Sequence, residues 1–313
     1  MIAQPFRLNP EYREYVWGGA RLRPEIVPTA EAWVVYEKDT VASGSYAGRT
    51  LAELATEFGV DLLGRRAVSQ TGIRFPVLAK LLDCAQWLSL QVHPNDEQAV
   101  ALEGPGLFGK TEAWQVLEAA PGSKLIAGMK PGVSAESLAD SIRNGTILET
   151  VQMLEVKAGD TIFMSPGTIH ALGPGLLIYE IQQTSDLTYR VYDWGRPQTE
   201  ARKLHIDKAL AVSRPDAAGS VQPAPVLEDG ETRVLSQCQY FSLELILAKE
   251  KMVSLNTLGE SFHALTLIEG QAKVVVGGEY QLLQRFETVL VPAACGAYRI
   301  EPVEGCRVLK AGV

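Results

Sequence analysis

The sequence is poor in features that mark several large classes of protein. Four cysteines in 313 residues, with no CxxC spacing, exclude a disulfide framework. Acidic residues outnumber basic ones by 37 to 29, which argues against a surface that wraps nucleic acid or a polybasic membrane anchor. No apolar run approaches the roughly 20 residues of a membrane span, and the first residues do not resemble a signal peptide. We therefore expect a cytoplasmic protein that binds neither nucleic acid nor a membrane.

Histidine is equally scarce. Any metal site built on imidazole must draw on four residues: His93, His170, His205 and His263. Two of them stand beside proline corners, His93 in QVHP and His170 in PGTIH. This places the chemically informative histidines in two short motifs.

Short segments of strand character make up most of the chain. Glycine (28) and proline (17) punctuate it, and the β-branched segments between them are typical of strands bounded by turns: 159–172, 176–183, 187–194, 263–278 and 287–293. Helical signals are local, and several begin at good N-cap residues: 50–64, 95–103, 134–145 and 204–213. Many strands with few helices predict a mainly β protein of sandwich or barrel units rather than a doubly wound α/β sheet.

The chain is long enough for two packed units, because its length is near the upper limit of a single core. Residues 214–231 are rich in proline, alanine, glycine and acid, and they show neither helical nor strand periodicity. We expect this segment to link a larger domain, 1–213, to a C-terminal domain, 232–313.

A faint internal repeat supports two related units. The segment GDTIFMSPGTIH (159–170) aligns with FETVLVPAACGA (286–297), so that His170 is opposite Ala297. If the copies are related, the first retains a chemical residue that the second lacks. The alternative is a chance likeness between two strand–turn segments.

Polar residues in three motifs suggest a metal site. Side chains two residues apart on a strand share a face, so Gln91 and His93 point together, as do Lys110 and Glu112. With His170 these motifs offer two imidazoles, a carboxylate and an amide oxygen, which fit a divalent metal with an open coordination position. A Lewis-acid enzyme needs such a site. The alternative is that both histidines hold ordinary core or surface positions, the commoner role of a lone strand histidine.

Residues 104–111, GPGLFGKT, also match the P-loop expression G-x-x-x-x-G-K-[ST]. A P-loop follows a buried strand and opens a helix at its lysine, so that backbone amides cradle phosphates. Here the preceding residues are acidic and helical in character, and the Trp-Gln-Val that follows suits a strand. We interpret the match as accidental. The alternative, a nucleotide-binding protein, predicts ATP binding that depends on Lys110.

The segment 179–196, YEIQQTSDLTYRVYDWGR, is unusually polar for a strand pair. Glu180 and Gln182 share one face, and Arg190 lies between tyrosines on the second strand. An arginine so placed can hold an anion bidentately or stabilise a developing oxyanion. The alternative is an exposed cross-strand ion pair.

The motifs described above occur in a specific order along the chain, together with three others: WGG (17–19), EAW (31–33), FPVLAKLLD (75–83), LSLQVHPND (88–96), GKTEAW (109–114), GDTIFMSPGTIHALG (159–173) and EIQQTSDLTYRVYDWGR (180–196). In this pattern the chain resembles the type I phosphomannose isomerases (mannose-6-phosphate isomerases) in their shorter bacterial form, which belong to the cupin superfamily. The resemblance covers nearly the whole chain, and its QVHP and EIQQTSDLTYRVYDW motifs are highly specific. It implies a mainly β fold of two cupin-type β-barrel (jelly-roll) units with inserted short helices.

The resemblance also implies a metal centre. It places one zinc ion per chain on His93, Glu112 and His170, with Gln91 as a further ligand in the longer relatives. The C-terminal copy has no such ligand set, because His263 stands alone there. We therefore expect the C-terminal unit to be structural.

Two departures from the family pattern leave the ligands untouched. The usual Ile-Gly-Glu-Ser-Trp reads TAEAW at 29–33, and Ser165 stands where cupins usually have a proline. These changes bear on substrate preference rather than on metal binding.

The activity implied by the resemblance is interconversion of mannose 6-phosphate and fructose 6-phosphate through an enediol. Such a reaction needs a metal that polarises the C1 and C2 oxygens and a base that moves a proton between the two carbons. The resemblance places Arg190 in the active site and Lys110 beside the sugar phosphate, and the base is Glu180 or Lys110. The alternative from another class is a cupin that binds metal and sugar phosphate without turnover. Nothing in the sequence predicts an oligomeric state.

Overall fold

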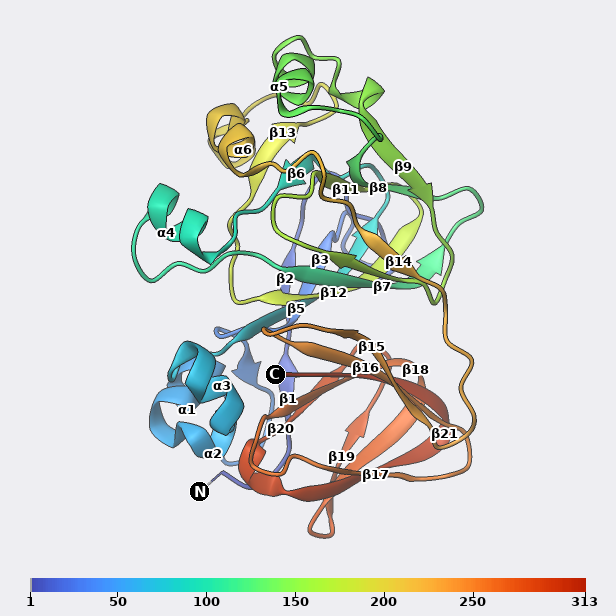
Figure 1. The fold of residues 1–313 in the computed structure, drawn as a ribbon. Coiled ribbons are helices and arrows are strands. Elements are labelled where there is room, and N and C mark those ends of the chain that lie inside the picture. The colour runs from blue at the N-terminus through green and yellow to red at the C-terminus, as the bar shows by residue number, and fades with distance from the viewer. Residues whose placement is uncertain (1) are drawn as a thin grey trace. The chain divides into compact units, whose positions relative to one another are not determined.

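The computed structural model describes residues 2–313 and shows a mainly β protein with two compact units (Figure 1). Unit 1 comprises the N-terminal residues to Tyr12, Ala32–Leu81 and Pro225–Val313, and unit 2 comprises Arg13–Glu31 and Leu82–Ala224. These units differ in membership from the sequential domains expected, because the chain starts in unit 1 and returns to it. The division at 214–231 into independently folding domains stays a prediction.

Unit 2 contains the segments in which the sequence predicted chemistry. Its helices are short: α4 (Asp96–Glu103), α5 (Ala135–Arg143), α6 (Ile206–Val212), η1 (Ile147–Glu149) and η2 (Glu200–Arg202). Its strands are β6 (Leu90–Val92), β7 (Glu112–Ala119), β8 (Lys124–Met129), β9 (Val151–Glu155), β10 (Thr161–Met164), β11 (His170–Leu172), β12 (Leu176–Gln183), β13 (Tyr189–Tyr192) and β14 (Ser220–Gln222). The chain crosses between the units in or beside β2 (Glu11–Arg13), β3 (Glu31–Val35) and β5 (Val77–Cys84).

Two antiparallel sheets of unit 2 surround one core. The first contains β14, β10, β7 and β12 in that order, and the second has the order β13-β6-β11-β8-β9. Alternate residues of β7 and β12 point into the core, where Ile178 is opposite Val116 and packs with Leu172 of β11. On the same face, Glu180 is opposite Trp114, and the next pair on that face, Gln182 with Glu112, is also polar. The core is therefore apolar along most of its length and polar where β12 ends and β7 begins.

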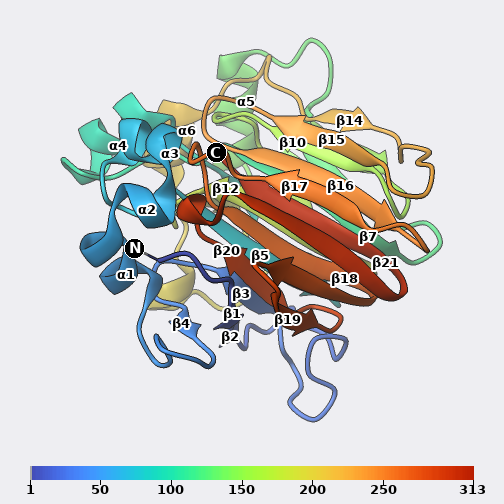
Figure 2. The ribbon, with the colours of Figure 1, turned by 90° about the horizontal axis from the view of Figure 1, so that it is seen from below.

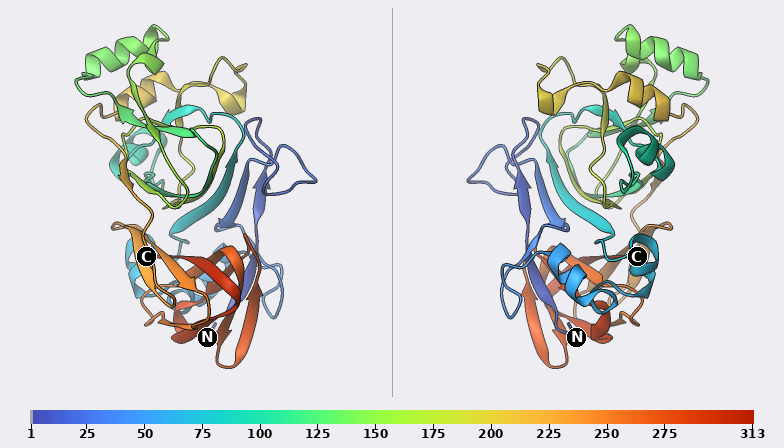
Figure 3. Two further views of the ribbon diagram at one scale, coloured as in Figure 1. Left: turned by 90° about the vertical axis from the view of Figure 1, so that its right-hand side faces the viewer. Right: turned by 90° about the vertical axis from the view of Figure 1, so that its left-hand side faces the viewer.

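Unit 1 is built on one large antiparallel sheet with the order β15-β16-β21-β18-β20-β1-β4, and β17 and β19 pair with β21 and β18 (Figure 2). The strands are β1 (Phe6–Asn9), β4 (Thr40–Val41), β15 (Thr232–Gln237), β16 (Ser242–Ala248), β17 (Val253–Asn256), β18 (His263–Val276), β19 (Glu279–Leu283), β20 (Thr288–Val291) and β21 (Ala297–Gly312). Its helices are α1 (Leu51–Phe58), α2 (Val60–Leu63), α3 (Arg65–Thr71) and η3 (Ala293–Cys295). In the right-hand view of Figure 3 the blue helices lie against the strands of this unit, where α2 packs on η3.

The helix starts predicted from capping residues are confirmed. Thr50 and Asn95 each cap a helix through a reciprocal capping box, and the Ser134 hydroxyl accepts the backbone N–H of Ser137. The helix expected over 50–64 is divided, because Gly59 has a positive φ of 47° that ends α1 before α2 begins.

The segment expected to be an unstructured linker contains a strand. Within 214–231, β14 pairs antiparallel with β10, so that Ile162 is opposite Val221. The side chains of β14 are exposed, which explains why no hydrophobic alternation marks this strand in the sequence. No helix among residues 2–313 is long and apolar enough to cross a membrane.

Candidate metal centre and active site

Three buried ligand side chains meet at the polar end of the unit 2 core. His93 follows β6, Glu112 begins β7 and His170 begins β11. Their candidate ligand atoms all lie within 4.8 Å of one another. Nε2 of His93 is 3.6 Å from Oε2 of Glu112, and Nε2 of His170 is 3.3 Å from the other oxygen, Oε1. The structure thus brings together three of the four ligands that the sequence suggested.

Backbone carbonyls orient both imidazoles. Nδ1 of His93 is 2.8 Å from the Leu187 carbonyl oxygen, and Nδ1 of His170 is 2.9 Å from that of Thr168. A carbonyl can only accept, so each Nδ1 carries a hydrogen, and Nε2 is the nitrogen of each ring that faces Glu112. Burial, together with the nearby positive charge of Lys110, lowers the pKa of His170 to about 4. The His170 ring is therefore neutral at physiological pH, as a metal ligand must be.

The proline corner before His170 connects the two histidines. Pro166 and Gly167 occupy the centre of a turn closed by the Thr168 N–H and the Ser165 carbonyl, and Gly167 has a φ of 85°. The Gly167 N–H donates to the His93 carbonyl oxygen at 2.9 Å. One turn therefore holds the backbone at the first histidine and supplies the carbonyl that orients the second.

The strand register aligns further site residues in one row. His170 of β11 is opposite Gln91 of β6, and Gln91 is opposite Arg190 of β13. Residues directly opposite in a ladder point to the same face of the sheet, so these three side chains lie side by side. Nε2 of Gln91 is 3.3 Å from Nε2 of His170. Ligation by Gln91 stays a prediction.

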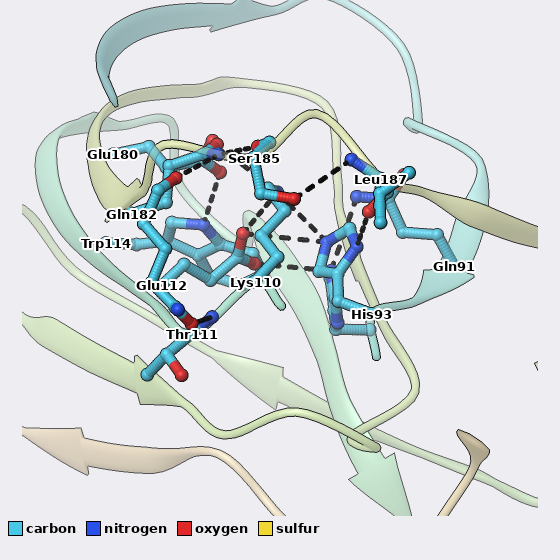
Figure 4. A network of polar contacts seen from close by, with 12 residues as sticks. Gln91, His93, Lys110, Thr111, Glu112, Trp114, Glu180, Gln182, Ser185 and Leu187 are labelled. Carbon is cyan, nitrogen blue, oxygen red and sulfur yellow. Dashed lines mark hydrogen bonds and ion pairs between the residues drawn. The ribbon is translucent and has the colours of Figure 1, made fainter. Parts of the chain in front are cut away.

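Lys110 lies against the metal ligands. Its side chain is buried, and Nζ donates to Glu112 Oε2 at 2.5 Å and approaches His93 Nε2 at 3.0 Å (Figure 4). Nζ is also 3.8 Å from Oε1 of Glu180. The lysine reaches this position because its backbone N–H donates to the Pro94 carbonyl, directly after the first histidine.

Glu180 and Gln182 extend from β12 into the same polar region (Figure 4). Glu180 accepts the indole N–H of Trp114 through Oε2 at 2.8 Å. Gln182 is opposite Glu112 in the ladder, and its Nε2 donates to the carbonyl oxygens of Gln183 and Ser185. These two acceptors determine which way the amide faces. Oε1 of Gln182 is then buried without a hydrogen-bond partner in the part of the chain that the structure describes.

One nitrogen of the Arg190 guanidinium is hydrogen-bonded and another has no partner among the described residues. Its Nη1 donates to the Lys203 carbonyl oxygen at 3.2 Å, while its buried Nε has no hydrogen-bond partner within residues 2–313. Burial lowers the pKa of Arg190, and the positive charge of Arg202 adds to this effect. The predicted alternative, an exposed ion pair, is wrong: Arg190 forms no salt bridge within the described range, and the nearby Asp193 pairs with Arg196 and Arg202 instead.

The P-loop interpretation fails on the local structure. A helix, α4, precedes residues 104–111, and a strand, β7, follows them. The loop therefore has the reverse of the strand–loop–helix order that directs backbone amides at a phosphate. Nζ of Lys110 donates to the carboxylate of Glu112.

Comparison with known proteins identifies the family. Residues 5–106 match the model of the phosphomannose isomerase type I catalytic domain. Mannose-6-phosphate isomerase ManA of Bacillus subtilis is 32% identical, covering 98% of this chain and 99% of that protein. The chain belongs to the type I phosphomannose isomerase family. A family member from Streptococcus mutans is 33% identical, covering 96% of both chains.

Solved structures of phosphomannose isomerases share the fold. The mannose 6-phosphate isomerase from Bacillus subtilis superposes with a TM-score of 0.88 at 30% identity, covering 99% of both chains. A zinc-bound mannose 6-phosphate isomerase superposes with a TM-score of 0.76 at 16% identity, which shows the common fold alone. The mainly β, cupin-type fold expected from the sequence is thereby confirmed. Strand pairings among residues 2–313 nevertheless form open sheets rather than closed barrels.

For this phosphomannose isomerase family member, sequence reasoning found most of the site and missed its supports. It named the three residues that the structure brings together and the polar side chains of β12, but treated Gln182 only as a neighbour of Glu180. Their roles as ligands stay a prediction. A glutamine two residues after a glutamate, on a strand that starts with Leu-Leu-Ile-Tyr, was the available signal. The carbonyls of Leu187 and Thr168 carried none, because every residue has a carbonyl.

Proposed function

We propose that this protein is a zinc-dependent isomerase that interconverts mannose 6-phosphate and fructose 6-phosphate. The observation that carries the proposal is the convergence of His93, Glu112 and His170, with Nδ1 of both imidazoles bound to a carbonyl oxygen so that Nε2 faces the carboxylate. Tetrahedral zinc bonds of about 2.0–2.2 Å place neighbouring ligand atoms roughly 3.3–3.6 Å apart. The imidazole nitrogens lie 3.6 and 3.3 Å from the two different oxygens of Glu112, which is close to this spacing. The set of one ligand atom per residue lies within 4.8 Å, so the ligands would draw together around the ion. A bound zinc supplies Lewis-acid polarisation of the sugar oxygens at C1 and C2.

We assign proton transfer to Glu180. The reaction moves a proton between adjacent carbons, so the base must accept the proton and then return it. Nζ of Lys110 already donates to Glu112 and lies against Nε2 of His93, so this nitrogen is engaged with the metal ligands. Glu180 has one oxygen fixed by Trp114 and the other 3.8 Å from the lysine. The carboxylate is the better acceptor, and Lys110 supplies positive charge beside the enediolate.

Two further side chains have the chemistry to bind the substrate. Nε of Arg190 and the nitrogen beside it form a planar edge that can hold an oxyanion bidentately, either the phosphate or the enediolate. The buried Oε1 of Gln182 can accept a hydrogen bond only, which suits a sugar hydroxyl. Both groups lie on sheet faces that they share with metal ligands.

The decisive test is a coupled isomerase assay run together with zinc analysis. Purified protein should lose activity to a chelator and regain it with zinc. His170→Ala should lower both zinc content and turnover, whereas Arg190→Ala should retain zinc and lower turnover. His263→Asn, a histidine change in unit 1, is the matched control and should change neither.

Full activity in protein free of metal would contradict the role of zinc. Binding of sugar phosphate without turnover would favour the alternative of a binding protein. We further propose a cytoplasmic location, because the four cysteines are free and two of them are buried, as in a reducing compartment.

A further inference from the structure

His205, which belongs to neither metal motif, contacts both backbone groups of Arg190. The His205 N–H donates to the Arg190 carbonyl oxygen at 2.8 Å. In return, the Arg190 N–H donates to Nδ1 of the His205 side chain at 3.3 Å. Arg190 lies on β13, the edge strand of its sheet, with β6 on its other side. His205 therefore takes the place of a missing neighbouring strand at this one residue.

The same segment also holds the guanidinium. Two residues before His205, the Lys203 carbonyl accepts Nη1 of Arg190 at 3.2 Å. Because Nη1 is engaged there, the edge that contains Nε is left for a ligand, and Nε has no hydrogen-bond partner within residues 2–313. Residues 203–205 thus contact both backbone groups of Arg190 and one nitrogen of its guanidinium, while the buried Nε stays without a partner among the described residues.

The contact requires a neutral imidazole. Nδ1 can accept the Arg190 N–H only when the ring hydrogen is on Nε2, and a protonated ring has no acceptor. Burial is the main cause that lowers the pKa of His205. Arg190 of β13, Lys203 before α6 and Lys208 of α6 add to this, while Glu103 of α4 opposes them. Glu103 is itself bound by Lys208 and by the hydroxyl of Tyr189.

We propose that His205 is a positioning residue that holds Arg190 in the orientation in which its open edge meets the substrate. This inference rests on the proposed function, because Arg190 is assigned there to an oxyanion of the sugar phosphate. Protonation of His205 removes the acceptor of the Arg190 N–H. Isomerase efficiency consequently carries an acid-side loss to which His205 contributes.

The test compares His205→Phe, which keeps a ring without an acceptor, with His205→Asn, whose Oδ1 replaces Nδ1 and does not titrate. A hydrogen bond worth about 1 kcal/mol corresponds to roughly a fivefold change. His205→Phe should lower kcat/KM about fivefold at unchanged zinc content, and His205→Asn should restore most of it. The ratio of kcat/KM for His205→Asn to that of the wild type should rise as pH falls from 7 to 5.

A double-mutant cycle separates positioning from a general structural role. In the Arg190→Ala background, His205→Phe should have no further effect on kcat/KM, because it acts through the guanidinium. Equal effects in both backgrounds, or loss of zinc in His205→Phe, would overturn the proposal.

A readout without substrate keeps this inference distinct from the proposed function. Backbone amide hydrogen exchange across 187–194 should be faster in His205→Phe than in the wild type or His205→Asn. If the wild type lacks isomerase activity, the proposed function fails while exchange still tests the contact. Unchanged exchange together with an unchanged kcat/KM would refute the role of His205.

Discussion

At the scale of single residues, the metal centre depends on side chains whose protonation is set by their neighbours. In His93 and His170, a carbonyl oxygen binds Nδ1, so that Nε2 is the nitrogen that faces the site. Lys110 places an ammonium beside the carboxylate of Glu112 in a site where all four groups are buried. Desolvation makes each of these contacts stronger than its counterpart on the surface, and it makes each unmatched group costly.

Gln182 provides a prediction about substrate binding. Gln182→Leu removes a buried acceptor that faces the site, and we expect kcat/KM to fall about tenfold or more, in line with the roughly 1–3 kcal/mol cost of a lost partner. Zinc content should not change. Gln115→Leu is the matched control: this buried glutamine on β7 already accepts the Thr161 hydroxyl, so its loss should lower stability and leave kcat/KM unchanged. Equal losses of efficiency in both variants would contradict the assignment.

His263 provides a prediction about pH and stability. Burial, with a further contribution from Lys310, lowers the pKa of His263 to about 3, and its Nδ1 shares a hydrogen bond with the Tyr298 hydroxyl. Lys310 is itself paired with Glu244. Between pH 6.5 and 3 the unfolded chain binds a proton that the folded chain does not, so the stability present above pH 6.5 falls with decreasing pH. By pH 5 the loss should reach about 2 kcal/mol.

This loss can be measured by urea unfolding at pH 7 and pH 5. His263→Asn removes the titrating group and should show a smaller difference between the two pH values than the wild type does. An equal difference in both proteins would show that His263 titrates normally in the folded state.

At the scale of elements, a turn contributes more than any strand to holding the two histidines in place. The corner at 165–168 joins β10 to β11, receives the first histidine through the Gly167 N–H and orients the second through the Thr168 carbonyl. Gly167 is required at this corner for two reasons: its φ is 85°, and a Cβ there would lie 2.9 Å from the Val212 carbonyl oxygen.

Gly167→Ala should therefore reduce both stability and zinc affinity. We expect a cost larger than the roughly 1 kcal/mol of a positive φ alone, together with weaker zinc retention on dialysis. Gly145→Ala is the control, because Gly145 also has a positive φ, 72°, but a Cβ there would meet nothing within 4 Å. If both variants lose the same stability and retain zinc equally, the corner does not position the ligands.

The elements were predicted well where local signals suffice. The strand expected over 176–183 is β12, with those bounds, and helix α4 begins after its predicted cap, Asn95. The helix over 50–64 was wrong in one respect, because Gly59 divides it. The strand β14 was missed because its exposed side chains leave no alternation to detect.

At the scale of the whole molecule, the described ligand set lies in unit 2. Unit 1 has a corresponding polar end of its core, where Glu244 pairs with Lys310 and His263 contacts Tyr298. Among residues 2–313 these groups do not form a second cluster of metal-ligating residues. That the C-terminal copy is structural, and that the two copies form an internal repeat, both stay predictions.

Zinc should stabilise the protein through unit 2. A ligand at about 1,000 times its dissociation constant adds roughly 4 kcal/mol to the free energy of unfolding when it binds only the folded state. The free energy of unfolding, measured in urea with zinc and with chelator, should differ by about this amount. Glu112→Gln should reduce the difference strongly. A difference that persists in Glu112→Gln would place the stabilising zinc elsewhere.

The scarce histidines show what the sequence determined and what the tertiary structure decided. Local pattern was enough to select His93 and His170, because residue type and proline corners are properties of the chain itself. It could not show that the Leu187 carbonyl orients His93, since these residues are 94 positions apart and a carbonyl has no residue-specific signature. The same limit hid His205, whose importance depends on a contact with Arg190 across an edge strand. The fold alone decides which backbone groups meet which side chains.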